Sequence, residues 1–78
     1  MDRNSIMIRL NEIFSDFFDD EITLSDHTCA DDIEEWDSLT HITLISEVED
    51  TFGMKFSMKD VLGMQNVGEM AEIIEKSI

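Results

Sequence analysis

Ser38 is the residue of this sequence best placed to take part in a reaction, because a carboxylate precedes it directly and an imidazole follows three residues later. The stretch reads Glu-Glu-Trp-Asp-Ser-Leu-Thr-His-Ile, which places Asp37 and His41 on either side of the hydroxyl. Apolar residues at helical spacing begin here, so we predict that Ser38 lies at the amino end of a helix. Three roles are then open: a helix cap, a nucleophile, or a point of covalent attachment.

The first two roles make different demands on the chain. As a cap, Asp37 or Ser38 would accept a backbone N–H, worth about 1 kcal/mol. As an esterase nucleophile, Ser38 would need His41 as a base, a third group to orient it, an oxyanion hole and a substrate cleft. A chain of 78 residues has little room for that set, so we expect that the protein is not an enzyme. If Ser38 only caps a helix, the protein is a small acidic helical adaptor, and this alternative stays open.

Covalent attachment fits the position of Ser38 better than either of these roles. The positive end of a helix dipole and its free N–H groups favour a phosphate, so a phosphodiester is well placed there. A second enzyme can supply the base and the metal for the attachment step. The serine then needs only to be exposed, to lie beside a loop and to adjoin a docking surface.

The strong negative charge limits the partners. The chain has 19 Asp and Glu residues against 5 Lys and Arg residues, a formal net charge of −14. Such a field repels nucleic acid, and it attracts proteins with basic patches. Self-repulsion favours a monomer. We read no leader and no apolar run long enough to cross a bilayer, and the single Cys29 excludes an intramolecular disulfide, so we expect a cytoplasmic protein without membrane insertion.

A metal site is a weaker hypothesis. Asp26-His27-Thr28-Cys29, followed by Asp31-Asp32, gathers possible ligands. The run has neither the paired spacing of zinc ligands nor a glycine-centred calcium loop, so we expect no specific metal.

The apolar pattern predicts helices and no strands. The first helix has Asp2 or Asn4 as its cap, and the second runs from about residue 38 to residue 52 and stops at Gly53. Between them, residues 19–36 lack helical periodicity and form a long loop. We expect four apolar residues to pin this loop to the bundle: Ile22, Leu24, Ile33 and Trp36.

A short third helix and a fourth helix complete the predicted bundle. Ser57 caps the third helix, and Gly63 ends it. Asn66 and Glu69 form a capping box at the start of the fourth. Together with the first two helices, this makes an all-α fold of three main helices and one short one. The residues expected to face the core are Ile6, Leu10, Ile13, Phe14, Phe17, Ile42, Ile45, Val48, Phe52, Val67, Met70, Ile73, Ile74 and Ile78.

The region around Ser38 resembles an acyl carrier protein. The similarity extends without a gap from Trp36 to Val67, and more loosely over the rest of the chain. It rests on the triplet Asp37-Ser38-Leu39, on the short third helix, on the total length, and on Ile42, Leu44, Glu49, Phe52, Gly53 and Phe56. The triplet has meaning only in this structural context. The resemblance implies a small four-helix bundle, with residues 1–78 as a single acyl carrier domain.

The resemblance also implies a prosthetic group. Ser38, flanked by Asp37 and Leu39, would receive 4′-phosphopantetheine from coenzyme A through a phosphopantetheinyl transferase that uses Mg²⁺. The thiol of this arm would hold an acyl or aminoacyl group as a thioester and present it to enzymes of fatty-acid, polyketide or related lipid biosynthesis. The chain itself would do no chemistry, and Cys29 would play no part.

The resemblance assigns a docking surface to the second helix. Its residues would meet arginines and lysines of acyl-loading and acyl-processing enzymes, where charge sets orientation and encounter rate. Thr40 and Thr43 stand where fatty-acid carriers often have acids, which makes specialised pathways candidates as well. The docking residues implied are Asp37, Leu39, Glu47, Glu49 and Asp50.

A cargo pocket is the last implication of the resemblance. Phe56 and Met70 are bulky for their positions, which reduces the preformed void, although methionine adapts its shape readily. We therefore expect a short or polar cargo, or one held largely outside the core. The pocket residues implied are Ile45, Val48, Phe52, Phe56, Val61, Met64 and Met70.

Overall fold

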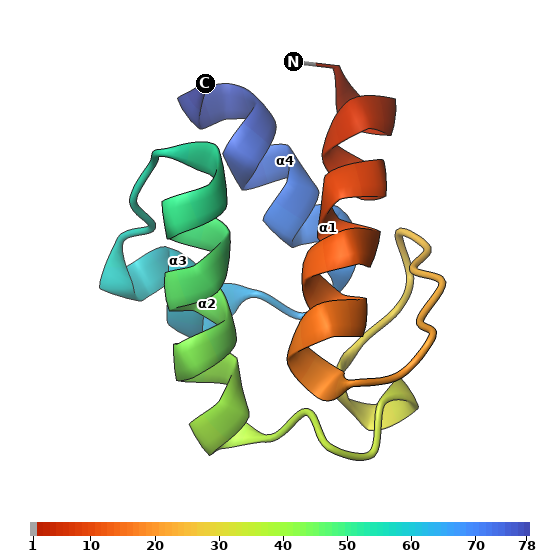
Figure 1. Ribbon diagram of the computed structural model, residues 1–78. Helices are drawn as coiled ribbons and strands as arrows, with labels where there is room; N and C mark the ends of the chain where they lie inside the picture. Colours follow the sequence, from red (N-terminus) through yellow and green to blue (C-terminus); the bar gives the residue numbers. More distant parts are fainter. Residues whose placement is uncertain (1) are drawn as a thin grey trace.

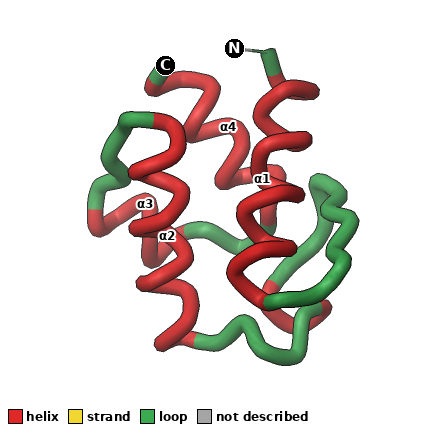
Figure 2. The backbone as a smooth tube through the Cα atoms, in the orientation of Figure 1, coloured by secondary structure: helices red, strands yellow, loops and turns green. Residues whose placement is uncertain are grey.

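Helices and loops, without a strand, make up residues 2–78, the part of the chain that the computed structural model describes (Figures 1 and 2). The elements in chain order are α1 (Arg3–Phe18), the single-turn 3₁₀ helix η1 (Ala30–Asp32), α2 (Ser38–Phe52), α3 (Met58–Gly63) and α4 (Val67–Ser77). Three long helices and one short helix are therefore present, and the predicted all-α fold is confirmed.

α1 is the central packing element, because it contacts both α2 and α4. In Figure 1, α2 lies beside α1, α4 lies behind them, and the two chain ends are at the top. The long loop between α1 and α2 runs up beside α1, comes back down to η1 and then passes below the bundle to the start of α2. In this view α3 lies beside α2 and partly behind it, on the side of α2 away from α1.

An aspartate residue caps each end of α1, Asp2 at the start and Asp19 at the end. The Asp2 side chain accepts a hydrogen bond from the Ser5 amide at 2.8 Å, so Asp2, of the two caps expected, is the one used. Asp19 ends the helix at φ 51°, in the left-handed region that glycine usually occupies, and its amide donates to the Ser15 carbonyl.

The buried stripe of α1 runs in steps of four: Ile6, Leu10, Phe14 and Phe18. Ile13 and Phe17 were expected in the core but are only partly buried, at its edge. Phe18 takes the buried position instead, since residues four apart lie one above another on a helix.

The loop of residues 19–36 is pinned to the bundle as predicted. Leu24 and Trp36 are buried, and Ile22 and Ile33 are partly buried against the core. The Leu24 amide also donates to the Asn11 side chain at 2.7 Å. This fixes the loop to α1 before the chain enters α2.

α2 differs from its predicted orientation. Ile42 is 55% exposed, although we expected it in the core, while Leu44 is fully buried. The buried face of α2 follows Leu44, Ile45 and Val48, which turns Ile42 away from the core; Phe52 is half-buried at its edge. Gly53 ends the helix at φ 64° in the left-handed conformation, as predicted.

The caps of the last two helices follow the sequence closely. Ser57 accepts from the Asp60 amide to start α3, which ends at Gly63, and Asn66 accepts from the Glu69 amide to start α4. The Glu69 carboxylate accepts from the amide of Gln65 rather than from that of the cap, so the reciprocal half of the predicted capping box is wrong.

The core contribution predicted for α4 is mostly confirmed. Val67, Met70 and Ile74 are buried, and Ile73 is partly buried against the core. Ile78 is 47% exposed, because it lies just beyond the last turn of α4, and its predicted place in the core is wrong.

Candidate functional site

The start of α2 is organised by Asp37 rather than by Ser38. The Asp37 carboxylate accepts hydrogen bonds from the amides of Leu39 and Thr40, both at 2.9 Å. The Thr40 hydroxyl in turn accepts from the Asp37 amide at 2.8 Å, which completes a capping box. The hydrogen bond from the Thr40 amide, assisted by that from Leu39, holds the pKa of Asp37 below its ordinary value.

Ser38 is therefore the first residue of the helix and not its cap. Its side chain is exposed, and its hydroxyl takes part in none of the hydrogen bonds found among residues 2–78. The hydroxyl lies at the positive end of a helix of 15 residues, where a phosphate is electrostatically favoured. The interpretation of Ser38 as a structural cap is wrong for this chain, since Asp37 has that role.

His41 is engaged elsewhere and does not act on Ser38. Its Nδ1 accepts from the Trp36 indole N–H at 3.0 Å, and its Nε2 lies 3.2 Å from the Val61 carbonyl oxygen. A carbonyl only accepts, so Nε2 carries the proton and the ring is the neutral tautomer. With both nitrogens bonded, no base addresses the serine, and the arrangement needed for an esterase is not formed.

A groove of about 720 Å³ opens beside Ser38. Ser38, His41 and Ile42 line it from α2, and the opposite wall comes from α3 and the loop that follows. Of the predicted pocket residues, Val61, Met64 and Met70 line this groove. The other four do not: Ile45, Val48 and Phe56 are buried in the core, and Phe52 is half-buried.

Sequence reasoning missed half of the polar residues that line this groove. Asp31 reaches it from η1, and Gln65 and Asn66 reach it from the loop between α3 and α4. Trp36 lines it too, although it was predicted only as a loop anchor. The signal available in the sequence was the nearness of Trp36 and His41 to Ser38.

The comparisons with known proteins agree with this geometry. Residues 9–74 match the family model described as a phosphopantetheine attachment site. The holo acyl carrier protein from Geobacter metallireducens has a similar solved structure, with a TM-score of 0.85 and 38% sequence identity over 91% of this chain and 83% of that chain. The chain belongs to the acyl carrier protein family. Comparison with curated proteins gives no match.

Membership of this family identifies the protein as a carrier and not as an enzyme, with covalently attached 4′-phosphopantetheine as its prosthetic group. The structure of this carrier fits such a group at the start of α2. An exposed hydroxyl that has no hydrogen-bond partner among residues 2–78, a helix amino end and an adjoining groove are found together there. The group, when bound, supplies the thiol that forms the thioester.

The residues predicted for docking are not equally available on this carrier. Asp37, Leu39, Glu47 and Asp50 are exposed, Leu39 by 82%. Glu49 is half-buried, and its carboxylate accepts from the Phe56 amide at 2.8 Å, so it anchors the loop before α3. The docking role stays a prediction for all five residues.

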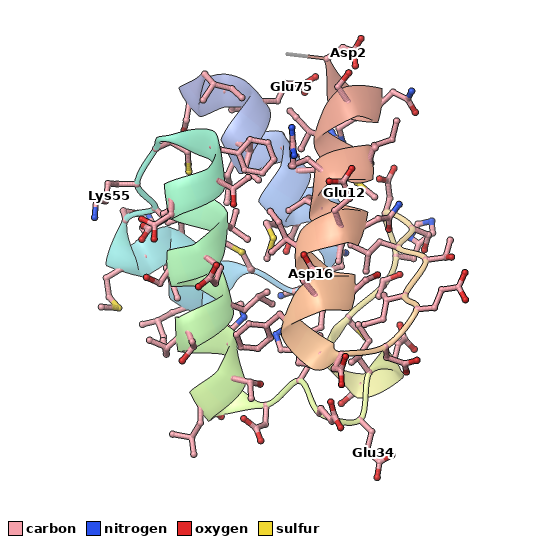
Figure 3. The ribbon with its side chains drawn as sticks, viewed as in Figure 1. Asp2, Glu12, Asp16, Glu34, Lys55 and Glu75 are labelled. Atoms are coloured by element: carbon pink, nitrogen blue, oxygen red, sulfur yellow. The ribbon has the colours of Figure 1, made fainter. Side chains whose placement is uncertain are left out.

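Exposed apolar side chains that were not among the predicted docking residues extend this surface. Ile42 of α2 and Leu62 of α3 are exposed and line the groove, and Met58 is exposed at the start of α3. In Figure 3 the labelled side chains of Glu34 and Lys55 extend away from the bundle, Glu34 at its lower end and Lys55 from the loop between α2 and α3.

Two other observations concern the described residues 2–78. No three His, Cys, Asp or Glu side chains in that range lie together in a way that could hold a metal ion. The Asp32 carboxylate accepts from the Cys29 amide at 3.0 Å, which uses it inside the turn of η1. None of the helices in this range combines the length and the hydropathy required to span a membrane.

Proposed function

We propose that Ser38 is the attachment site and that the carrier holds acyl or aminoacyl groups as thioesters for enzymes of fatty-acid, polyketide or related lipid biosynthesis. The observation that carries the proposal is the free, exposed hydroxyl of Ser38 at the start of α2, with capping left to Asp37. A transferase that uses Mg²⁺ and coenzyme A supplies the base that takes the proton from this hydroxyl. No base from the chain is needed, which agrees with the engagement of His41 elsewhere.

The cargo that suits this carrier is short or polar. Three of the seven predicted pocket residues reach the groove, namely Val61, Met64 and Met70. Polar groups of Asp31, Gln65 and Asn66 share the lining with them. A long alkyl chain would leave part of its length beside these polar groups, which costs free energy relative to an apolar tunnel.

The partners are enzymes with basic docking patches. Asp37, Glu47 and Asp50 present carboxylates along α2, and Leu39 adds an apolar contact next to Ser38. Rim charges of this type raise the encounter rate and set the orientation, and they leave release fast. Residues 1–78 then act as one carrier domain, which we propose to be a monomer of the cytoplasm.

The attachment is tested by incubating the protein with coenzyme A, Mg²⁺ and a broad-specificity phosphopantetheinyl transferase, followed by intact-mass measurement. We expect a gain of one phosphopantetheine in the wild type and none in Ser38→Ala. Ser46→Ala is the matched control, because Ser46 is also exposed on α2 and should not affect loading. A gain that survives in Ser38→Ala would place the site elsewhere, and a wild type that gains nothing would overturn the proposal.

A further inference from the structure

α3 is the least secured helix of the carrier. It has six residues, too few to be stable alone, and Val61 is the side chain that it buries. Leu62, the neighbour of Val61, is 77% exposed. Among the hydrogen bonds of residues 2–78, the one between His41 and the Val61 carbonyl joins α3 to another helix. α3 is therefore the wall of the groove that costs least to displace.

His41 is itself held in place by a residue of the core, Trp36. The Trp36 indole donates to its Nδ1, and the Trp36 ring packs edge-on against Phe14, with 5.2 Å between ring centroids. On its other side, Nε2–H of His41 reaches a carbonyl in the last turn of α3, where helix carbonyls lack intrahelical partners. A connected path runs from the core through Trp36 and His41 to α3.

The hydrogen bond between His41 Nε2 and the Val61 carbonyl, here called the tie, lies where the groove ends along α2. Ser38, His41 and Ile42 line the groove. One turn further along the same face, Ile45 is only 4% exposed, and Val48 beyond it is fully buried. The tie thus stands at the boundary between the open groove and the closed apolar interior.

From this placement, we propose that His41 is a positioning residue that determines cargo specificity. With the tie intact, α3 stays against α2, the interior near Ile45 and Val48 stays closed, and the cargo is confined to the groove with its polar rim. Without the tie, α3 moves outward and a longer alkyl chain reaches the apolar interior. The inference rests on attachment at Ser38 and adds the residue that decides which acyl groups the carrier shelters.

The test uses the full chain loaded with acetyl-, butyryl- or octanoyl-phosphopantetheine from the matching acyl-coenzyme A. The carriers are the wild type, His41→Leu, which removes both hydrogen bonds, and His41→Gln, which keeps an amide N–H for the Val61 carbonyl. For each, the midpoint of thermal unfolding of the holo form is subtracted from that of each acyl form. The subtraction removes any general loss of stability that the substitution causes.

For the wild type and for His41→Gln, we expect the difference in unfolding midpoint between the acyl and holo forms to be nearly the same for all three acyl groups. For His41→Leu, we expect octanoyl to raise the midpoint by about 5 °C or more over acetyl, because several methylenes become buried. Parallel chain-length profiles in the wild type and His41→Leu would overturn the role of His41 while leaving attachment intact. Absence of loading, seen first by mass, would overturn the attachment and this inference together.

A second measurement needs no variant and covers the case in which His41→Leu does not fold. Backbone amide signals of Ile45 and Val48 are compared by NMR between the holo and octanoyl forms of the wild type. Unchanged signals are expected, because the interior stays closed. Large shifts at these two amides would show that the chain enters despite the tie, and the proposal would be wrong.

Discussion

Two contacts of the carrier are held together differently: that of α4 with the loop of residues 19–36, and that of α3 with α2. At α4 the connection is made by two hydrogen bonds between backbone groups. The amide of Val67 donates to the carbonyl of Thr28 at 2.8 Å, and the amide of Gly68 donates to that of Asp26 at 3.0 Å. At α3, a single side-chain hydrogen bond from His41 makes the connection. The contact between α4 and the loop is thus the firm side of the carrier, and the contact between α3 and α2 is its loose side. This difference suits the role proposed for the groove in receiving and releasing cargo.

Arg3 reinforces the firm side. Its guanidinium donates to the Gly68 carbonyl at 3.0 Å and lies within ion-pair distance of Asp26 and Glu75, at 3.5 and 3.8 Å. The N-terminal turn, the loop and α4 therefore meet at one side chain. Nothing comparable connects α3 to its neighbours within residues 2–78, so substitutions on the two sides should have unequal effects.

The largest effect is expected in the shared core. Phe14 is fully buried and contacts the ring of Trp36 edge-on. Phe14→Ala should lower the free energy of unfolding by about 3–5 kcal/mol, because it removes a large apolar side chain and leaves a cavity. Leu62→Ala on α3 is the control and should change it by less than about 0.5 kcal/mol, since Leu62 is exposed. Urea unfolding measures both, and similar losses would contradict the comparison.

Two glycines test the backbone contact on the firm side. A Cβ at Gly68 would lie 2.7 Å from the Asp26 carbonyl oxygen, whereas a Cβ at Gly63 would meet nothing within 4 Å. Gly68→Ala should therefore destabilise by about 1–3 kcal/mol, because backbone must shift to relieve the clash. Gly63→Ala should be neutral or slightly stabilising. If thermal unfolding of the two variants coincides, the close approach of α4 to the loop is not a constraint.

Glu49 tests the loose side. Its carboxylate accepts from the Phe56 amide, which holds the loop before α3. Glu49→Ala should cost about 1–2 kcal/mol and increase hydrogen exchange at Phe56, because a partly buried amide loses its partner. Glu47→Ala removes an exposed acid of the same helix and should leave that exchange unchanged. Equal exchange in both variants would mean that Glu49 does not anchor the loop.

The smallest effect is the loss of helix capping at acid pH, and it can be measured separately for the caps of α1 and α2. Hydrogen bonds from backbone amides lower the pKa of both Asp2 and Asp37 from 3.8. A lowered folded-state pKa means that each cap stabilises its helix above about pH 4 and that this contribution is lost as pH falls through the lowered value. In an NMR titration, Asp37→Asn should remove this acid response at the amides of Leu39 and Thr40. Asp2→Asn should leave it in place, and a response that persists in Asp37→Asn would assign it to another group.

The limits of sequence reasoning are clearest on α2. The start of the helix at residue 38 and its end at Gly53 were predicted correctly, since both depend on neighbours within one turn. Which face would be buried was predicted less well: Ile42 is exposed and Leu44 is buried. Periodicity identifies an apolar stripe, but how that stripe is rotated depends on where α1 packs.

The sequence by itself determined the helices, most of their caps, the acidic surface and a serine at the amino end of α2, because each follows from composition or from residues at most four apart. The tertiary structure decided that His41 bonds Val61, 20 residues along the chain, and that Glu49 turns inward to the Phe56 amide. It also decided that η1, the loop between α3 and α4, and Met70 of α4 line the groove beside Ser38 together with α2 and α3. These features depend on where α3 sits against α2, a placement set by packing between distant segments.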